Sequence, residues 1–478
     1  MRSPNYVWLA GLGVTLILIG LPLYLFTFDP PVAAADPWSN VPDRSTAGTD
    51  HTALIKGPFE TGSDVTKACL SCHEDAGEQM IGTAHFTWLS EPEAIPGRDG
   101  EPQRIGKANL LNNFCIGVQS NWTSCTRCHT GYGWTSADYD FTKTENVDCL
   151  ACHDQSGMYV KAAAGQPAEG VDLVYVAQSV GTPSRQNCGA CHFDGGGGNG
   201  VKHGDLDESL YFPPESVDVH MGEFDFLCVD CHQTTDHQIK GRSVGVSAQN
   251  TNGVACTDCH DAATQHEDSR ITEHLDTVAC QTCHIPATAL RDPTKVEWDW
   301  SQAGQSGRAE SQHTYLKIKG AFIYENDYIP QYTWYNGTVS RYLMGDVVDP
   351  NVVTHINYPQ GTIDDATALI YPFKVHLAKQ PYDAINHYII PPHTTGTDGY
   401  WTLFDWNSAM EKGAAAAGLS YSGAYGFVST DMYWKQTHMV QPAENALTCT
   451  DCHGETGRLD WQALGYAGDP MTWGGRTK

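Results

Sequence analysis

The sequence is short of positive charge. Its 478 residues include 28 Lys and Arg against 56 Asp and Glu, a formal net charge of -28 at pH 7. This excess of negative charge opposes binding to nucleic acid and to anionic membrane surfaces, so we expect neither as a partner. An acidic surface also helps to keep a protein soluble. If the substrate is an anion, a local cluster of lysines must override the global field.

The sequence has almost no cysteine outside one repeated motif. Sixteen of the seventeen cysteines fall into eight copies of one Cys-x-x-Cys-His motif, and Cys115 alone is left over. The eight copies are Cys69/Cys72/His73, Cys125/Cys128/His129, Cys149/Cys152/His153, Cys188/Cys191/His192, Cys228/Cys231/His232, Cys256/Cys259/His260, Cys280/Cys283/His284 and Cys449/Cys452/His453.

This motif is the attachment signal for c-type haem. The two thiols bond to the porphyrin vinyl groups, and the histidine reaches the iron from the proximal side. A disulfide scaffold would not place His after each second Cys, and zinc sites would not need eight identical half-sites. We therefore expect eight covalently bound haem c groups.

Apolar residues are too few for conventional packing. They make up 41% of the chain, while glycine (47) and proline (25) fill 72 positions. The short segments between successive motifs cannot each build an apolar core, so stacked porphyrins must supply the missing apolar surface. The sequence predicts a multihaem cytochrome c of mostly short α-helices and long loops wrapped round a stacked haem array, with little β-structure.

Residues 7–28 form an uncharged run of 22 residues, long enough to span a bilayer. We expect a single N-terminal membrane anchor, with a signal segment cleaved after Ala33-Ala34-Ala35 as the alternative. Either would export the rest of the chain, which agrees with haem attachment outside the cytoplasm. The protein is therefore expected in the periplasm or another extracytoplasmic space, anchored to the inner membrane.

Four regions are expected along the chain: the anchor or signal segment (1–28), a tether (29–60), a seven-haem region that includes a catalytic haem (61–290) and an aromatic-rich cover that carries the eighth haem (291–478). In the cover, strand-like patches and loops are expected, with a short helix within 408–420.

Each iron needs a second axial ligand unless it is a reaction site, and histidines outside the motifs are the natural supply. Thirteen such histidines exist. The best placed, all within about 20 residues of a motif, are His85, His203, His220, His237, His274 and His438. His51, His266 and His376 come next. Because thirteen exceeds eight, all eight irons can have two histidines, which would make the protein an electron conduit.

Two features favour an enzyme over a conduit. The glycine-rich stretch 195–205 ("GGGGNGVKHGD") can bring backbone close to a porphyrin and presents Lys202 beside His203. Cys115 is an unpaired thiol close to the second motif. The alternatives are a solvated loop lysine and a buried, inert cysteine.

Several stretches resemble the octahaem tetrathionate reductase family. They are "NNFC" before the second motif, "NVDCLACHD", "RQNCGACHFDGGGGNGVKHGDL", "DVHM", "VACQTCHIP" and "PFKVHLAKQPYD", within a resemblance that covers roughly residues 50–460. Hydroxylamine oxidoreductase and the cytochrome c nitrite reductases are wider relatives by haem arrangement. The pentahaem nitrite reductases use a Cys-x-x-Cys-Lys motif, which this chain lacks.

The resemblance implies seven haems with two histidine ligands each and one catalytic haem on Cys125, Cys128 and His129. It places Lys202 on the distal side of the catalytic iron as a ligand, with Cys115 close by and Asn112 near it.

The function this predicts is the extracytoplasmic reduction of a sulfur oxyanion, tetrathionate to thiosulfate. Cys115 as a thiolate would attack the central S–S bond, and Lys202 would hold the anion or supply a proton. The alternatives are the electron conduit and a nitrite- or hydroxylamine-converting enzyme, including an oxidase. A quinol dehydrogenase or another redox protein is expected as electron donor, and a homo-oligomer is possible.

Overall fold

The computed structural model describes residues 18, 48–113, 117–195, 197–262 and 266–476. The chain divides into two units, residues 1–42 and 43–478, and every described residue except Leu18 belongs to the second. The expected anchor, apart from Leu18, and Cys115 therefore lie outside the described residues. In the part of the chain that is described, no helix combines the length and apolarity needed to cross a membrane.

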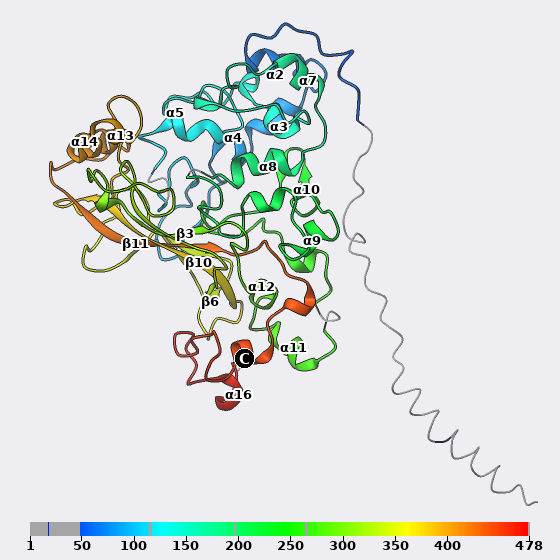
Figure 1. The fold of residues 1–478 in the computed structure, drawn as a ribbon, viewed down its shortest axis with the longest axis vertical. Helices are drawn as coiled ribbons and strands as arrows, with labels where there is room; N and C mark the ends of the chain where they lie inside the picture. Colours follow the sequence, from blue (N-terminus) through cyan, green and yellow to red (C-terminus); the bar gives the residue numbers. More distant parts are fainter. Residues whose placement is uncertain (1–17, 19–47, 114–116, 196, 263–265, 477–478) are drawn as a thin grey trace, which may run out of the picture. The chain divides into compact units, whose positions relative to one another are not determined.

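The first half of the second unit is a succession of short helices joined by loops (Figure 1). The helices are α2 (Gly62–Leu70), α3 (Ala76–Ile81), α4 (Ala84–Thr87), α5 (Trp122–Cys125), α6 (Leu150–His153), α7 (Leu173–Gln178), α8 (Arg185–His192), α9 (Val219–Gly222), α10 (Cys228–Cys231), α11 (Ser269–His274) and α12 (Cys280–His284). This confirms the predicted fold class of short helices and long loops.

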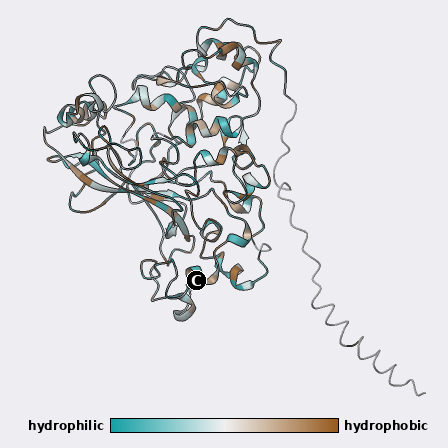
Figure 2. Ribbon diagram, viewed as in Figure 1, coloured by the Kyte–Doolittle hydropathy of each residue, from teal (hydrophilic) through white to brown (hydrophobic). Residues whose placement is uncertain are grey.

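All eight motifs lie in or at the end of a single helical turn. α6, α8, α10, α12 and α15 (Cys449–Cys452) contain motif residues, α2 carries Cys69, and short 3-10 turns carry the second and sixth motifs. Residues three and four apart share one helix face, so a turn brings both cysteines and the histidine to the same side. Figure 2 shows apolar residues scattered among polar ones in these helices, as expected where they do not form a continuous apolar core.

The second half of the unit is built on a seven-stranded sheet. Its order is β4 (Tyr315–Leu316), β5 (Gly320–Glu325), β3 (Thr294–Asp299), β10 (Leu369–Asp383), β11 (Tyr425–Lys435) and β8 (Thr354–His355), and β6 (Gln331–Tyr335) pairs with the first part of β10. β10 runs antiparallel to β11 from Phe373 opposite Lys435 to Asp383 opposite Tyr425. It runs parallel to β3. Strand is thus concentrated in the region where the sequence predicted strand-like patches.

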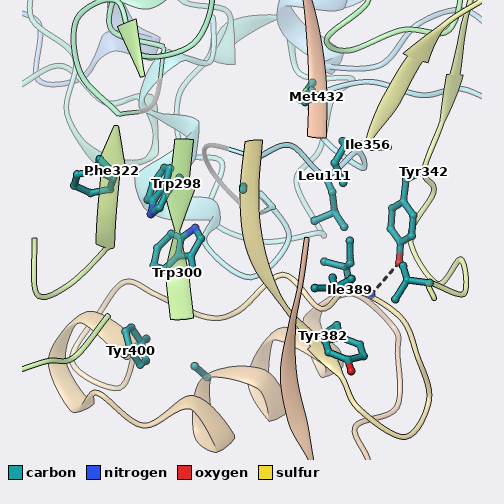
Figure 3. Close-up of a cluster of buried hydrophobic side chains, with 14 of the residues drawn as sticks. Leu111, Trp298, Trp300, Phe322, Tyr342, Ile356, Tyr382, Ile389, Tyr400 and Met432 are labelled. Carbon is teal, nitrogen blue, oxygen red and sulfur yellow. Dashed lines mark hydrogen bonds between the residues drawn. The ribbon is translucent and has the colours of Figure 1, made fainter. Parts of the chain in front are cut away.

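An aromatic core covers this sheet. Figure 3 shows Phe322, Trp298 and Trp300 at the left of the view and Leu111, Tyr342 and Ile389 at the right, all parts of one buried cluster. The rings of Trp298 and Trp300 stack with their centroids 4.7 Å apart. Helices α13 (Tyr400–Leu403) and α14 (Trp406–Ala416) lie against this end of the sheet (Figure 1).

Helix α14 confirms the short helix expected within residues 408–420. The Asp405 side chain caps it by accepting a hydrogen bond from the backbone N–H of Ser408. Helix α12 ends at His284 and β3 begins at Thr294, on either side of the boundary expected at residue 290. The four regions themselves stay predictions.

Candidate functional site

Seven of the eight motif histidines face a second histidine. The ring centroids in these pairs lie 6.0–6.5 Å apart, and each pair joins one motif histidine to one histidine from outside the motifs. The pairs are His73 with His51, His153 with His237, His192 with His85, His232 with His438, His260 with His220, His284 with His266, and His453 with His274.

This spacing fits an iron between the two rings. A metal–imidazole bond is about 2 Å long and the ring centroid lies about 1 Å behind its nitrogen, so two rings on opposite sides of one metal have centroids about 6 Å apart. Two cysteines lie in the same turn as each motif histidine. The residues present therefore fit haem c at all seven positions.

The motif cysteines differ in exposure, which the sequence did not predict. Thirteen of the sixteen are half-buried, as expected for thiols that bond to a porphyrin within a haem-filled interior, but three are exposed: Cys72, Cys231 and Cys449. Their assignment as haem-attachment residues stays a prediction, because bond formation requires the thiol to reach the vinyl group and does not require burial.

The exposure of Cys72 follows from its place in the first motif. It lies two residues beyond the end of α2, where the chain leaves the packed face of that helix. The backbone N–H groups of Cys72 and His73 both donate to the Cys69 carbonyl oxygen, at 3.1 and 2.9 Å, so the helical turn continues through the motif. The turn therefore keeps Cys72 on the same side as Cys69 and His73, although its side chain is at the surface.

Burial keeps several of the paired histidines neutral, which ligation requires because a protonated ring nitrogen cannot bind a metal. Burial lowers the pKa of His192 to about 3, with a further contribution from the neighbouring charge of His85. Burial likewise lowers the pKa of His85 and of His284. The pairs are thus suited to axial ligation at neutral pH.

The structure sorts the nine histidines that the sequence offered as distal ligands. Seven of them lie opposite a motif histidine, as given above, and His203 and His376 do not. The His203 ring instead packs edge-on against Trp434, with centroids 4.7 Å apart. His376 is fully buried on β10. The structure therefore does not support His203 or His376 as axial ligands, whereas the role of the other seven stays a prediction that fits the geometry.

The second motif differs from the other seven. Among the described residues, no histidine faces His129, and its ring is surrounded by aromatic side chains: Phe86, Trp88, Trp134, Tyr139 and Phe141, with centroids 4.8–6.3 Å away. His129 Nε2 donates a hydrogen bond to the Phe86 carbonyl oxygen at 2.6 Å. The ring must turn away from this carbonyl for Nε2 to bind an iron, so His129 fits haem c by residue type but not by its present orientation.

Cationic side chains lie around the second motif. In the chain before haem attachment, a hydrogen bond from the Cys191 thiol lowers the pKa of Cys128 to about 5, and the positive charges of Lys107, Lys202 and Arg127 contribute. Lys107 Nζ also lies 4.1 Å from the ring centre of Trp88, which contacts His129. The structure thus brings Lys202 close to the motif to which the family resemblance assigned it.

A buried lysine holds the loop that carries Lys202. Lys374 on β10 is fully buried, and its Nζ donates hydrogen bonds to the carbonyl oxygens of Val201 (2.9 Å) and Lys202 (2.8 Å) and contacts Thr294 Oγ1. Gly204 follows with a φ of 82°, and a Cβ there would lie 3.0 Å from Lys374 Cδ. The glycine is therefore required both by its conformation and by the closeness of Lys374.

The segment before the second motif is attached to the same sheet. Asn113 is fully buried; its Nδ2 donates to the carbonyl oxygen of His376 (2.9 Å), and its Oδ1 accepts from Gln380 Nε2 (2.6 Å) and Thr430 Oγ1 (2.9 Å). Asn112 is half-buried beside it. Cys115 itself lies outside the described residues, so its predicted position near the second motif stays a prediction.

Two buried lysines of this sheet, Lys295 and Lys374, were missed in the sequence as part of the site, and His376, which was expected as an axial ligand, is buried on the same strand as Lys374. Lys295 on β3 is 1% exposed, and its Nζ lies 3.9 Å and 3.8 Å from the ring centres of Trp298 and Phe322. Burial, with the charges of Lys374 and Lys295, holds the pKa of His376 well below its usual range. For Lys374 the signal was available in "PFKVHLAKQPYD", where Lys and His alternate within an apolar strand.

Cysteines of different motifs lie beside each other and define the order of the motifs in space. Pairs of thiols that shift each other's pKa join the first motif to the third, the second to the fourth, the fourth to the fifth and the sixth to the seventh: Cys69 with Cys149, Cys128 with Cys191, Cys188 with Cys228, and Cys256 with Cys280. Electrostatic interactions join the third to the fourth, the fifth to the sixth and the seventh to the eighth. The motifs therefore follow one line from the first through the third to the eighth, and the second adjoins the fourth.

Known cytochromes resemble most of this chain. Residues 295–456 match the family described as "Cytochrome c bacterial", and residues 214–285 match "Cytochrome c7 and related cytochrome c". An uncharacterized protein of Archaeoglobus fulgidus is 25% identical over a stretch that covers 43% of this chain and 85% of that protein. The crystal structure of octaheme cytochrome c from Shewanella oneidensis is 48% identical, with a TM-score of 0.85.

That solved structure decides the family, since the match covers 90% of this chain and 100% of the Shewanella chain. It supports covalently bound haem c, a role in electron transport and an oxidoreductase activity in general terms. Cytochromes c of this kind are typically extracytoplasmic. The chain belongs to the octahaem c-type cytochromes of the tetrathionate reductase family.

Proposed function

We propose that this protein is an octahaem reductase of a sulfur oxyanion, and that its substrate is tetrathionate. One observation carries the proposal: seven motif histidines face a second histidine, whereas none of the described histidines faces His129. Seven paired haems suit electron transfer, and an eighth with a different distal side suits a reaction site. This arrangement argues against a pure conduit with sixteen histidine ligands.

Charge near the second motif favours an anionic substrate. The chain has a net charge of -28, which repels a dianion such as tetrathionate from most of the surface. Lys107 and Lys202 lie near Cys128, and Lys295 and Lys374 are buried on the adjoining strands. Burial lowers the pKa of Lys374 well below its usual value, so the local attraction in this acidic protein is assigned to Lys107 and Lys202.

The proposed chemistry is cleavage of the central S–S bond. A Cys115 thiolate attacks one central sulfur, forms a new S–S bond to it and releases the first thiosulfate. Two electrons then break this new bond, which releases the second thiosulfate and restores the thiolate. Bound haems supply these electrons one at a time. Lys107 holds the dianion through its charge, and Lys202 does so once it has left the iron and gained a proton.

The proposal also includes the haem count, the location of the protein, its electron donor and the axial ligands. The chain carries eight haem c groups, one per motif, and works outside the cytoplasm, held at the inner membrane by residues 7–28. A quinol dehydrogenase or another redox protein supplies electrons. The seven histidine pairs hold the relay haems, with Lys202 as the distal ligand at the second motif.

Axial ligation is the decisive test. Electron paramagnetic resonance and near-infrared magnetic circular dichroism of the oxidised protein should report seven haems with two histidines and one with histidine and lysine. Lys202→Leu should change the spectrum of one haem, and the matched variant Lys379→Leu, an exposed lysine on β10, should change none. Eight haems with two histidines each would refute the proposed reaction site.

Turnover separates the substrates. With a reduced dye as donor, the protein should reduce tetrathionate to two thiosulfates, and Cys115→Ala should abolish this activity while haem content by mass stays at eight. Activity with nitrite or hydroxylamine that survives Cys115→Ala, with none for tetrathionate, would instead assign the protein to nitrogen chemistry.

A further inference from the structure

Two of the paired histidines donate a hydrogen bond to a carboxylate. His438 Nδ1 lies 3.2 Å from Asp205 Oδ2, and His453 Nδ1 lies 2.6 Å from Asp469 Oδ1. Four other paired histidines have a neutral partner at Nδ1: His153 with the Gly181 carbonyl, His232 with the Lys240 carbonyl, His274 with the Arg270 carbonyl and His237 with the Gln79 amide oxygen. His220 Nδ1 is 4.0 Å from Asp218, too far for a hydrogen bond.

Asp205 is built into the protein as an acceptor. It is 1% exposed, and its Oδ2 also accepts the backbone N–H groups of Thr437 (2.7 Å) and His438 (3.0 Å). Burial alone would lower the pKa of His438, but the hydrogen bond and the charge of Asp205 outweigh it and raise that pKa. The carboxylate therefore interacts strongly with the imidazole that faces His232.

Asp469 has the same relation to the eighth motif. Its carboxylate accepts the backbone N–H groups of Gly454 (2.6 Å) and Met471 (2.9 Å), which fixes it beside His453. The indole of Trp461 stacks on the His453 ring at 5.2 Å and 18°. The His453 side chain is 12% exposed, so the contact is largely shielded from water.

A carboxylate at Nδ1 makes an axial imidazole a stronger electron donor. The negative charge and the hydrogen bond both favour the ferric state, which carries one more positive charge than the ferrous state. We propose that Asp205 and Asp469 give the haems of the fifth and eighth motifs lower reduction potentials than the other paired haems. Reduction adds one electron to each iron, and the Nδ1 proton stays in its hydrogen bond.

The position of the fifth motif gives this difference a consequence for electron flow. Its cysteines contact those of the fourth motif on one side and interact with those of the sixth on the other. The second motif adjoins the fourth. Electrons that enter at the sixth, seventh or eighth haem must therefore pass the low-potential haem of the fifth motif before they reach the reaction site. Once two electrons have reached the haems of the second and fourth motifs, the same low potential hinders their return.

The test is a potentiometric titration of Asp205→Asn, Asp469→Asn and the double variant, followed by haem absorption. Asparagine removes the charge at both positions. At 205 its oxygen can still accept the backbone N–H groups of Thr437 and His438, whereas at 469 it keeps the acceptor for His453 and Met471 and loses the one for Gly454. Each single variant should move one of the lowest-potential one-electron components to a more positive potential, by on the order of tenfold in its equilibrium constant. The double variant should move two.

Asp364→Asn is the control, since Asp364 is exposed in a turn, where its backbone N–H donates to Thr362 Oγ1. It should leave every component in place. The proposal is overturned if neither Asp205→Asn nor Asp469→Asn moves a component, or if each of them moves every component alike. If the Asp205→Asn variant fails to bind its haems, the potentiometric titration of the Asp469→Asn variant alone tests the proposal. The proposal does not depend on the substrate, so loss of tetrathionate activity would leave it intact.

Discussion

The buried ammonium of Lys374 is expected to hold the loop that presents Lys202. Lys374→Met keeps the length and apolar stem of the side chain but removes the donor. The carbonyl oxygens of Val201 and Lys202 then lose a buried partner, whereas Thr294 Oγ1 keeps its hydrogen bond to the Gly200 carbonyl (2.7 Å). The damage is therefore confined to two acceptors in the loop.

The size of the effect follows from these two acceptors. A buried polar group left without its partner costs about 1–3 kcal/mol, so two cost about 2–6 kcal/mol. Methionine removes the desolvation cost of a buried amine, which offsets part of this loss. We expect Lys374→Met to lower the free energy of unfolding by about 2–4 kcal/mol.

Urea unfolding followed by haem absorption measures this difference from the midpoint and slope of the transition. Lys379→Met is the matched control, because Lys379 lies on the same strand with half of its side chain exposed and one surface ion pair to Asp299. It should change stability by less than about 1 kcal/mol. Lys374→Met should also alter the ligation spectrum that Lys202→Leu alters. An unfolding free energy within about 1 kcal/mol of wild type, with an unchanged spectrum, would refute the role given to Lys374.

Two further variants test the histidine assignments. His85→Leu should remove the two-histidine signature of one haem in near-infrared magnetic circular dichroism, whereas His203→Leu should leave all seven, and a loss with His203→Leu would contradict the pairing. The hydrogen bond from His355 to Asp431 (2.7 Å) raises the pKa of His355, so its stabilisation is complete below about pH 6.5 and is lost as pH rises through the raised pKa. Thermal unfolding should show His355→Gln less stable than wild type by about 0.5–1 kcal/mol at pH 5.5 and equal at pH 8.5, and a difference that grows with pH would contradict it.

Much of the local chemistry could be predicted from the sequence. Each haem attachment site is a pentapeptide, and its residues meet within one helical turn whatever the rest of the chain does. The short helix α14 and the strand-rich region after residue 290 also followed from local pattern. The extent of the sheet could not be predicted from local pattern, because strand pairing joins segments as distant as β3 and β10. Nor did the exposure of Cys72, which depends on how α2 packs against the rest of the chain.

The distal ligand of each haem was the feature hardest to predict from the sequence. Nearness along the chain favoured His203, which packs on Trp434, and ranked His51 and His266 lower, although both face a motif histidine. The buried Lys374 carried no functional signal by itself, since its role depends on a loop far away in the sequence.

The amino-acid sequence by itself determined how many haem-attachment motifs the chain carries, where each motif lies and which sign of charge the chain has in excess. These properties depend on residue type and on contacts within five positions. Only the tertiary structure decided which histidine faces which motif, which motif is left without one, and where Asp205 and Lys374 act. Those relations join distant segments, such as His232 with His438, and arise when the helices and the sheet pack together.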